Sequence, residues 1–285
     1  MNTLDGQTAE LHASFGNQEG DGEGAAKASH RATLLWAIAV VITIGAAAFQ
    51  RVTGPTFPVS GSITIGNQEV PFRFDRSHGG STDAPVQLQL VDTSVSGVLE
   101  WKQDGNGGRW TTQIMRREGE GLAGWIPCQS PGSLLRYRVA LLHGAEKTSI
   151  PSDEGILLRF KRDVPIPLLI AHIVAMFAAI LLSTRAGLDC FSPTPSLRTF
   201  TLLATTLFAV GGILFGALVQ KYAFDVYWTG WPMGHDMTDN KTALALAFWI
   251  AAAAAKGWSK GRRGWVMAAS SVSLAAFLIP HSVTG

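Results

Sequence analysis

The chain has 285 residues, of which 47% are hydrophobic and only 15% are charged, and its formal net charge at pH 7 is +2. So small a charge excess does not indicate a nucleic-acid partner, and no basic stripe with interleaved aromatic residues is present. The apolar residues are concentrated in long blocks, which favours a membrane protein over a soluble globular one.

The N-terminal segment combines a polar tail with an apolar run. Residues 1–31 are rich in glycine and polar side chains without an apolar period, so they are predicted to form a disordered cytoplasmic tail. Lys27 and Arg31 precede the apolar run, which predicts a first transmembrane helix over residues 32–50 that acts as an uncleaved signal anchor. A cleavable signal peptide is the alternative, because small residues occupy positions 46–48.

Between residues 55 and 161 the apolar period changes to two, which predicts half-buried β-strands. The segment Asp104-Gly105-Asn106-Gly107-Gly108 is typical of a turn between strands, because glycine and asparagine adopt positive φ at little cost. About seven or eight short strands over this segment indicate an antiparallel all-β sandwich inserted into a membrane α-helical bundle. The alternating positions are Ile63/Ile65, Val70/Phe72/Phe74, Val86/Leu88/Leu90, Trp110/Thr112/Ile114, Leu135/Tyr137/Val139/Leu141 and Ile156/Leu158/Phe160.

A resemblance to the late strands of immunoglobulin-like and fibronectin-III-like bacterial domains lies in Gly124-Trp125-Ile126-Pro127-Cys128-Gln129-Ser130-Pro131-Gly132 and the following Leu135-Arg136-Tyr137-Arg138-Val139. It covers roughly a third of the chain and implies an Ig/FnIII-like module at residues 55–161, which usually binds or spaces rather than catalyses. We expect Trp101, Trp110 and Trp125 to contribute to its core, because Trp110 follows the alternating apolar face.

Four further apolar blocks follow the β-rich segment, and each is a candidate span. They predict a four-helix transmembrane region over residues 164–280 and about five spans in total. The third block is too short for a hydrocarbon core of roughly 30 Å, so its helix is expected to begin near Met237 and to draw Asp239 into the bundle. A simple capping role for Asp239 is the alternative. The blocks are residues 164–184, 199–220, 242–255 and 264–280.

The basic residues of the short loops predict the orientation, because they collect on the cytoplasmic side of bacterial inner membranes. With these residues inside, the N-terminus is cytoplasmic, while residues 55–161 and the C-terminus are extracytoplasmic. Cys128 and Cys190 then lie on opposite sides and cannot pair. The predicted inner set is Lys27, Arg31, Arg185, Arg198, Lys256, Lys260, Arg262 and Arg263, against only Lys221 and Lys241 outside.

The loop at residues 221–241 gathers aromatic and ionisable side chains. Its aromatic residues Tyr222, Tyr227, Trp228 and Trp231 are typical of an interfacial belt. The stretch 218–241 also resembles a segment of bacterial multi-span inner-membrane proteins, and this resemblance brings no known catalytic residue. It implies that Asp236, Asp239, Asn240 and Lys241 act together.

Three histidines are predicted to lie toward the outer face, namely His172, His235 and His281. With Asp236 or Asp239 they would form one polar site near the outer membrane surface. Imidazole with carboxylate suits a divalent transition metal, and two axial imidazoles suit haem b. Their spacing matches no compact ligand motif, so a His172 hydrogen-bonded to another helix and a solvated His281 are the alternatives.

No phosphate loop, nucleophile elbow or haem-attachment motif occurs in the sequence. This favours a non-enzymatic subunit or binding component of an inner-membrane complex, with an extracytoplasmic recognition domain. Its expected partners are the lipid bilayer and other membrane-protein subunits. The alternative is a small transporter or ion-coupled membrane protein that uses His172, Asp239, Asn240 and Lys241 within the bundle.

Overall fold

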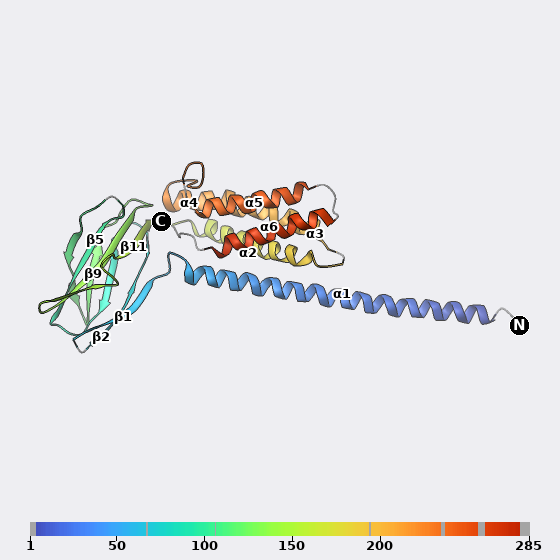
Figure 1. Cartoon of the computed structure of the whole chain (residues 1–285), viewed down its shortest axis with the longest axis horizontal. Coiled ribbons are helices and arrows are strands. Elements are labelled where there is room, and N and C mark those ends of the chain that lie inside the picture. Colours follow the sequence, from blue (N-terminus) through green and yellow to red (C-terminus); the bar gives the residue numbers. More distant parts are fainter. Residues whose placement is uncertain are drawn as a thin grey trace.

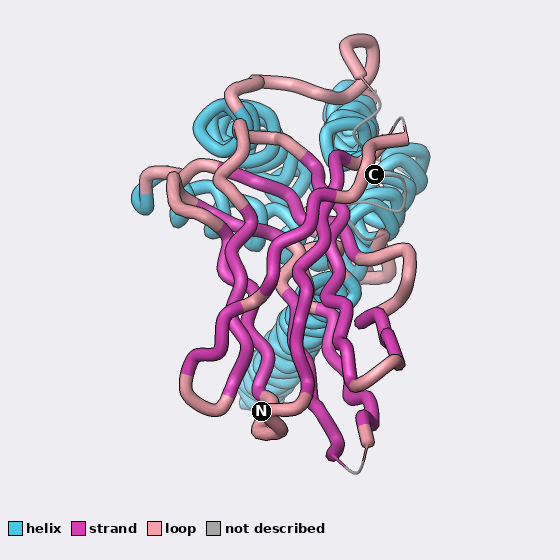
Figure 2. Tube along the Cα trace, turned by 90° about the vertical axis from the view of Figure 1, so that its left-hand side faces the viewer, coloured by secondary structure: helices cyan, strands magenta, loops and turns pink. Residues whose placement is uncertain are grey.

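The computed structural model describes residues 4–66, 68–105, 107–193, 195–234, 237–255 and 260–279. A β-rich region lies at one end of a group of helices, and the long helix α1 runs along this group and beyond it (Figure 1). Viewed from the side of the β-rich region, the strands lie in front of the helices (Figure 2).

Eleven strands lie in the described part of the chain, and they form three sheets. One sheet is the hairpin β1-β2, the second has the order β3-β11-β9-β5-β6 with β10 also paired to β9, and the third has the order β4-β8-β7. The strands are β1 (Val59–Ile65), β2 (Gln68–Phe74), β3 (Ser77–Gly79), β4 (Ala84–Gln89), β5 (Val95–Gln103), β6 (Thr111–Ile114), β7 (Arg116–Glu118), β8 (Gly121–Ile126), β9 (Leu134–His143), β10 (Glu146–Ile150) and β11 (Ile156–Lys161).

One apolar core joins the three sheets, because alternate side chains of each sheet point into it. The buried Tyr137 donates its hydroxyl to the Asp75 carbonyl at 2.8 Å, so its polar end has a partner. The core members that are at most 2% exposed include Val70, Phe74, Leu99, Ile126, Tyr137, Val139 and Phe160. The alternation predicted for β2, β4, β9 and β11 is therefore confirmed.

The alternation predicted for β6 is wrong, since all four of its residues are exposed and Ile114 is 77% exposed. The strand forms an edge of its sheet, and its apolar side chain Ile114 stays outside the core. The expectation for the tryptophans holds only in part. Trp101 packs against the core, whereas Trp110 and Trp125 are half-buried outside the core cluster.

The helical region consists of α1 and of the segments that follow the strands. α3, the π-helical η1 and α4 continue directly into one another, so they form one rod. The elements are α1 (Leu4–Thr53), α2 (Ile166–Asp189), α3 (Leu197–Leu207), η1 (Phe208–Phe215), α4 (Gly216–Phe224), α5 (Met237–Ala254) and α6 (Lys260–Leu278).

Three segments of the described chain are long and apolar enough to cross a membrane, namely Ser29–Thr53, Ile166–Asp189 and Leu197–Phe224. The prediction of a membrane bundle of about five spans with an inserted all-β sandwich is therefore wrong, since three candidate spans accompany eleven strands in three sheets. The apolar blocks at 242–255 and 264–280 belong to α5 and α6. These helices begin with polar turns, and charged side chains are costly in hydrocarbon.

Helix α1 is longer than its apolar segment. It begins at Leu4, whereas the sequence predicts a disordered tail over residues 1–31. Once the apolar segment is helical, each added residue extends an existing helix and no new nucleation is needed. The apolar part packs against α2 and α6 through a buried face of small residues, Ala39, Thr43 and Ala46.

Small residues also permit the other helix contacts. A Cβ atom on Gly211 of η1 would lie 2.6 Å from the Ala175 Cβ of α2, and one on Gly187 of α2 would collide with the Ser270 side chain of α6. Such close approaches are typical of helices packed in membranes, where dispersion contacts replace the hydrophobic driving force.

Candidate functional site

The outer face of the six-stranded sheet carries a group of charged side chains. Because side chains alternate along a strand, Glu100 and Lys102 of β5 point away from the core that receives Leu99. In the antiparallel register, Glu100 lies opposite Arg138 of β9, and Lys102 lies opposite Arg136. The first pair joins opposite charges, whereas the second places two cations next to each other on this face.

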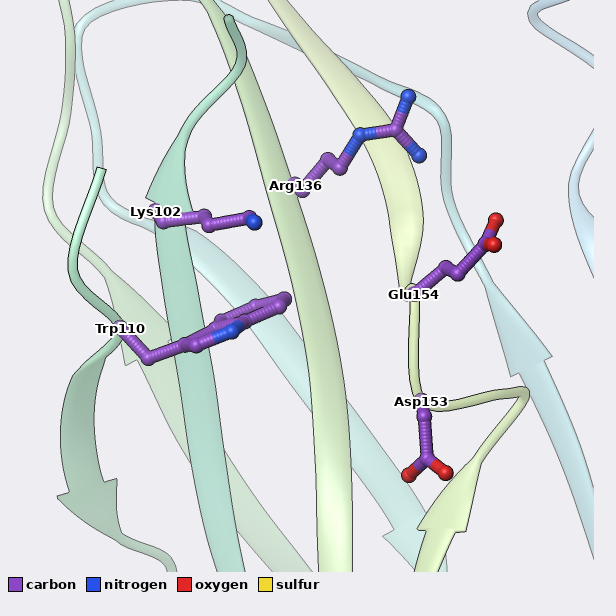
Figure 3. A pocket seen from close by; sticks show the side chains of 5 residues that line it. All are labelled: Lys102, Trp110, Arg136, Asp153 and Glu154. Atoms are coloured by element: carbon purple, nitrogen blue, oxygen red, sulfur yellow. The ribbon is translucent and has the colours of Figure 1, made fainter. Parts of the chain in front are cut away.

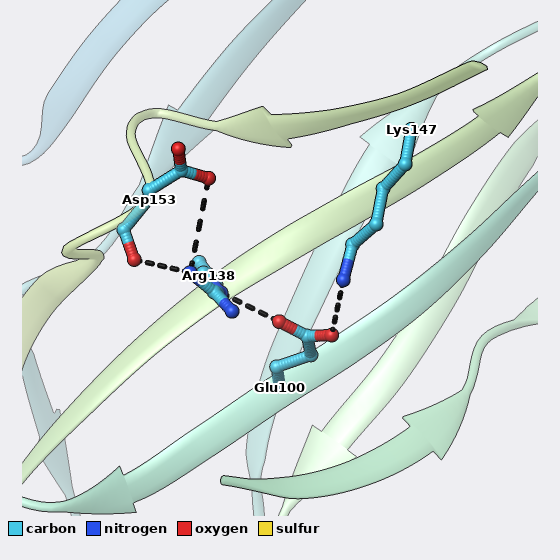
Figure 4. Close-up of polar contacts among 4 residues, drawn as sticks. All are labelled: Glu100, Arg138, Lys147 and Asp153. Carbon is cyan, nitrogen blue, oxygen red and sulfur yellow. Dashed lines mark hydrogen bonds and ion pairs between the residues drawn. The ribbon is translucent and has the colours of Figure 1, made fainter.

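Glu100 is the centre of an ion-pair network on this face (Figure 4). Its carboxylate accepts from Arg138 Nε at 2.5 Å and from Lys147 Nζ at 3.0 Å. Arg138 also donates to the Asp153 carbonyl on the turn after β10. Burial raises the pKa of Glu100, but the hydrogen bonds from Lys147 and Arg138 outweigh it and hold the pKa below its ordinary value.

Trp110 packs onto the same charges from the segment just before β6. Its ring centroid lies 4.2 Å from Arg138 Cζ and 4.8 Å from Lys102 Nζ. Figure 3 shows the Lys102 side chain extended alongside the indole ring. These contacts are cation–π interactions, and they explain why Trp110 is half-buried without entering the core.

A cavity of about 330 Å³ opens beside Trp110 (Figure 3). Lys102 and Arg136 line it from the strands, while Asp153 and Glu154 line it from the turn that precedes β11. Arg136 uses its Nε to bind Asp104 at 2.7 Å, which leaves the two terminal nitrogens of its guanidinium to act as donors. The cavity thus combines donors, acceptors and an aromatic ring, the groups that a recognition surface uses.

The predicted polar residues of α5 bind the chain's own loop. The Asp239 carboxylate accepts from the Thr229 amide at 2.7 Å, from the Gly230 amide at 3.0 Å and from the Gln220 side chain. Asn240 accepts from the Trp231 amide at 2.7 Å. The structure therefore gives these two residues a role in holding the loop before α5.

Lys241 and His172 also contact backbone carbonyls. Lys241 Nζ donates to the Ile279 carbonyl at 2.9 Å, which joins α5 to the end of α6. His172 Nδ1 lies 2.9 Å from the Gly211 carbonyl of η1, so the hydrogen bond to another helix is the arrangement observed. His235, Asp236 and His281 lie outside the described residues. Within the described ranges, no group of three histidine, cysteine or acidic residues could hold a metal ion.

The predicted interface aromatics lie at the end of the helices next to the β-rich region. Tyr222, Tyr227 and Trp231 are exposed, and Trp228 Nε1 donates to the Trp231 carbonyl at 3.2 Å. Exposed tyrosine and tryptophan side chains at the end of a candidate span are typical of a membrane interface.

Two contacts hold the β-rich region to the helices at this end. The Arg162 amide donates to the Ala223 carbonyl of α4 at 2.9 Å. The Arg159 guanidinium of β11 lies 5.4 Å from the Phe224 ring centroid. The sheet that carries the charged face therefore contacts the α3-η1-α4 rod directly, in addition to its covalent connection to α2.

No protein-family model matches this chain, and no curated protein matches it either. The candidate site therefore depends on the geometry of the chain alone. Sequence reasoning missed the charged face, although Arg136 and Arg138 alternate with the predicted core residues Leu135, Tyr137 and Val139. That alternation marks an outward row of cations, but only the register reveals the acidic partner Glu100.

Proposed function

We propose that this chain is a membrane-anchored recognition protein, and a subunit of a bacterial inner-membrane complex. Its apolar helices hold the β-rich region at the membrane surface, and the outer face of the six-stranded sheet binds a partner protein. The observation that carries this proposal is the cavity beside Trp110, where donors and acceptors of both charges surround an aromatic ring. Aromatic and arginine side chains are the residues most enriched among the energetic centres of protein interfaces.

The resemblance of residues 124–139 to late strands of immunoglobulin-like and fibronectin-III-like domains supports the same role, since such modules usually bind or space. The packing of α1 supports a retained anchor rather than a cleaved signal peptide. Its face of Ala39, Thr43 and Ala46 is buried against the neighbouring helices, which cleavage would uncover.

An extracytoplasmic location of the β-rich region is part of the proposal. Arg185, Arg198, Arg262 and Arg263 lie at the helix ends away from the β-rich region, as the positive-inside rule requires for that orientation. Cys128 is exposed on the β-rich region and Cys190 is buried, so the two free thiols provide a test. A membrane-impermeant maleimide should label Cys128 in spheroplasts, and labelling only after lysis would contradict the orientation.

Site-specific photo-crosslinking in native membranes tests the recognition face. A photoreactive residue at Glu154, on the rim of the cavity, should give a discrete crosslinked partner, and Trp110→Ala should abolish that product. The matched control is a photoreactive residue at Glu69, which is exposed on β2 away from the cavity. The same product from both positions, or recovery of a partner-free chain under mild detergent, would count against the proposal.

A further inference from the structure

The C-terminal turn of α2 brings together two arginines from different helices. Arg31 of α1 donates from Nη2 to the Phe191 carbonyl at 2.7 Å. Arg263 of α6 donates from Nη1 to the Cys190 carbonyl at 3.4 Å. Because these carbonyls belong to consecutive residues, the two guanidinium groups bind neighbouring acceptors on the same turn.

The nearby carboxylate does not neutralise this pair. Asp189 is 3% exposed, and it accepts from Arg185 Nη1 at 2.9 Å and from the Ser196 amide at 2.5 Å. Arg185 is buried as well, with its guanidinium 5.5 Å from the Trp36 ring and 5.0 Å from the Phe200 ring. The charges of Arg185 and Asp189 thus balance each other between the packed helices. The charges of Arg31 and Arg263 remain in excess.

Arg31 and Arg263 also keep hydrogen-bond donors available. A guanidinium group has five N–H donors, and the contact of each arginine with a carbonyl of the turn after α2 occupies one of them. Arg31 is exposed and Arg263 is half-buried, so both can reach a ligand at the surface. Arg198 of α3 adds a further exposed cation at this end of the helices.

The location of the pair indicates which anion it meets. Arg31 lies near the start of the candidate span Ser29–Thr53, and the α2 turn follows the end of the span Ile166–Asp189. Phe191 in this turn is 66% exposed, and Trp265, two residues after Arg263, is 47% exposed. In a bilayer, the ends of spanning helices lie at the level of the lipid headgroups, where tryptophan also collects.

The opposite end of the helices also carries cations, since Arg162 is exposed there and its amide binds the Ala223 carbonyl of α4. There Lys221 pairs with Asp225 at 2.8 Å, and Lys241 donates to the Ile279 carbonyl.

We infer that Arg31 and Arg263 form a binding site for the phosphate group of an anionic phospholipid. The inference rests on the membrane residence in the proposed function and concerns a different surface from the recognition face. Guanidinium forks match phosphate oxygens in a bidentate manner, and basic pockets between membrane helices bind anionic headgroups by this chemistry. The exposed apolar side chains of α1, such as Leu34 and Ile38, provide the adjoining surface for acyl chains.

The test uses the full chain in nanodiscs of phosphatidylcholine with a minor fraction of phosphatidylglycerol. The nanodiscs are dissolved in mild detergent, and the lipid molecules that stay bound to the chain are counted by native mass spectrometry. The unsubstituted chain should retain phosphatidylglycerol preferentially, and the double variant Arg31→Gln with Arg263→Gln should retain about tenfold less, as expected for loss of charge-assisted hydrogen bonds. Lys221→Gln is the matched control and should leave retention unchanged.

Further arms separate the alternatives. The double variant Arg31→Lys with Arg263→Lys keeps the charge without the planar fork, so it should retain an intermediate amount, and its unfolding temperature checks the fold. Equal retention of both lipids, or no effect of the glutamine substitutions, would overturn the inference. Competition by inorganic phosphate alone would assign the site to a free anion instead. A chain that carbonate extracts from membranes would refute the membrane residence itself, which distinguishes that failure from failure of the lipid site.

Discussion

In the β-rich region the large apolar side chains point inward, whereas in the helical region many of them point outward. The sheets bury Phe74, Tyr137 and Phe160. The helices bury mainly small residues around Trp249 and Phe208, while Val41, Ile166 and Val174 are each more than 60% exposed. The buried alanines of the helices, each at most 2% exposed, are Ala179, Ala186, Ala204, Ala245, Ala252 and Ala269.

This difference shows that the two regions are built for different surroundings. In water, removal of large apolar side chains from solvent drives folding, so they form the core. In lipid that driving force is absent between helices, and small residues allow the backbones to approach closely. The outward apolar side chains of the helices therefore support a lipid environment, and the charged face of the sheet supports an aqueous one.

The largest expected effect concerns the β-rich core. Phe74→Ala should lower the free energy of unfolding by about 3–5 kcal/mol, because it removes a fully buried aromatic ring. Trp110→Ala should cost only about 1–2 kcal/mol, since this ring packs on charged side chains outside the core. Denaturant unfolding of the full chain in detergent, followed by circular dichroism of the strands, measures both. Equal losses would place Trp110 in the core.

The next effect concerns the loop before α5. Asp239→Ala should cost about 1–3 kcal/mol, because the Thr229 and Gly230 amides lose their acceptor. Hydrogen exchange of those two amides should accelerate. Lys221→Gln is the control, since it removes only an exposed ion pair with Asp225 and should leave the stability nearly unchanged. Unchanged protection in the Asp239 variant would show that the loop is held by other contacts.

Helix packing offers a similar comparison. Gly187→Val should destabilise the helical region by about 1–3 kcal/mol, since its side chain would collide with Ser270 of α6. Gly264→Val faces open space within the described structure and should be nearly neutral. Thermal unfolding in detergent, monitored at the helical circular dichroism band, distinguishes the variants. Similar melting temperatures would indicate that α2 and α6 can separate without cost.

The smallest expected effect depends on pH. The folded-state pKa of Glu100 lies below its ordinary value of about 4.5, so its ion pairs contribute stability above that pH. The contribution is lost as the pH falls through the lower, folded-state pKa. The unfolding midpoint of the β-rich region should therefore decrease at acidic pH, and Glu100→Gln should weaken that decrease. An identical pH profile for the variant would mean that Glu100 titrates in the same way before and after unfolding.

The sequence predicts those elements whose surroundings repeat regularly. Period-two alternation located β2, β4, β9 and β11, because one face of each strand meets the core. The same pattern misled at β6, since alternation does not reveal whether a second layer covers the strand. The apolar runs at residues 32–50, 164–184 and 199–220 coincide with the three candidate spans. The prediction of two further spans at residues 242–255 and 264–280 is wrong, because polar first turns shorten the apolar parts of α5 and α6.

The candidate site was less predictable, because its residues meet through pairing rather than through sequence spacing. Glu100 and Arg138 become partners only through the antiparallel register of β5 and β9, and a shift by one residue would turn each to the other face. The proximity of Arg31 and Arg263 similarly requires three helices to meet at one turn. By contrast, the sequence predicts a structural or functional partner for Asp239, because this carboxylate precedes an apolar run that is too short for a span.

The packing of α1 against α2 has a consequence for biosynthesis. All eleven strands lie between the two helices in the chain, so α1 leaves the ribosome long before α2 exists. During that interval the face formed by Ala39, Thr43 and Ala46 has no α2 to cover it. Closure of this contact must therefore follow synthesis of the whole β-rich region, which makes α1 docking a late event in assembly. A chain truncated before Ile166 would carry an anchor whose small-residue face is open to lipid or to other helices.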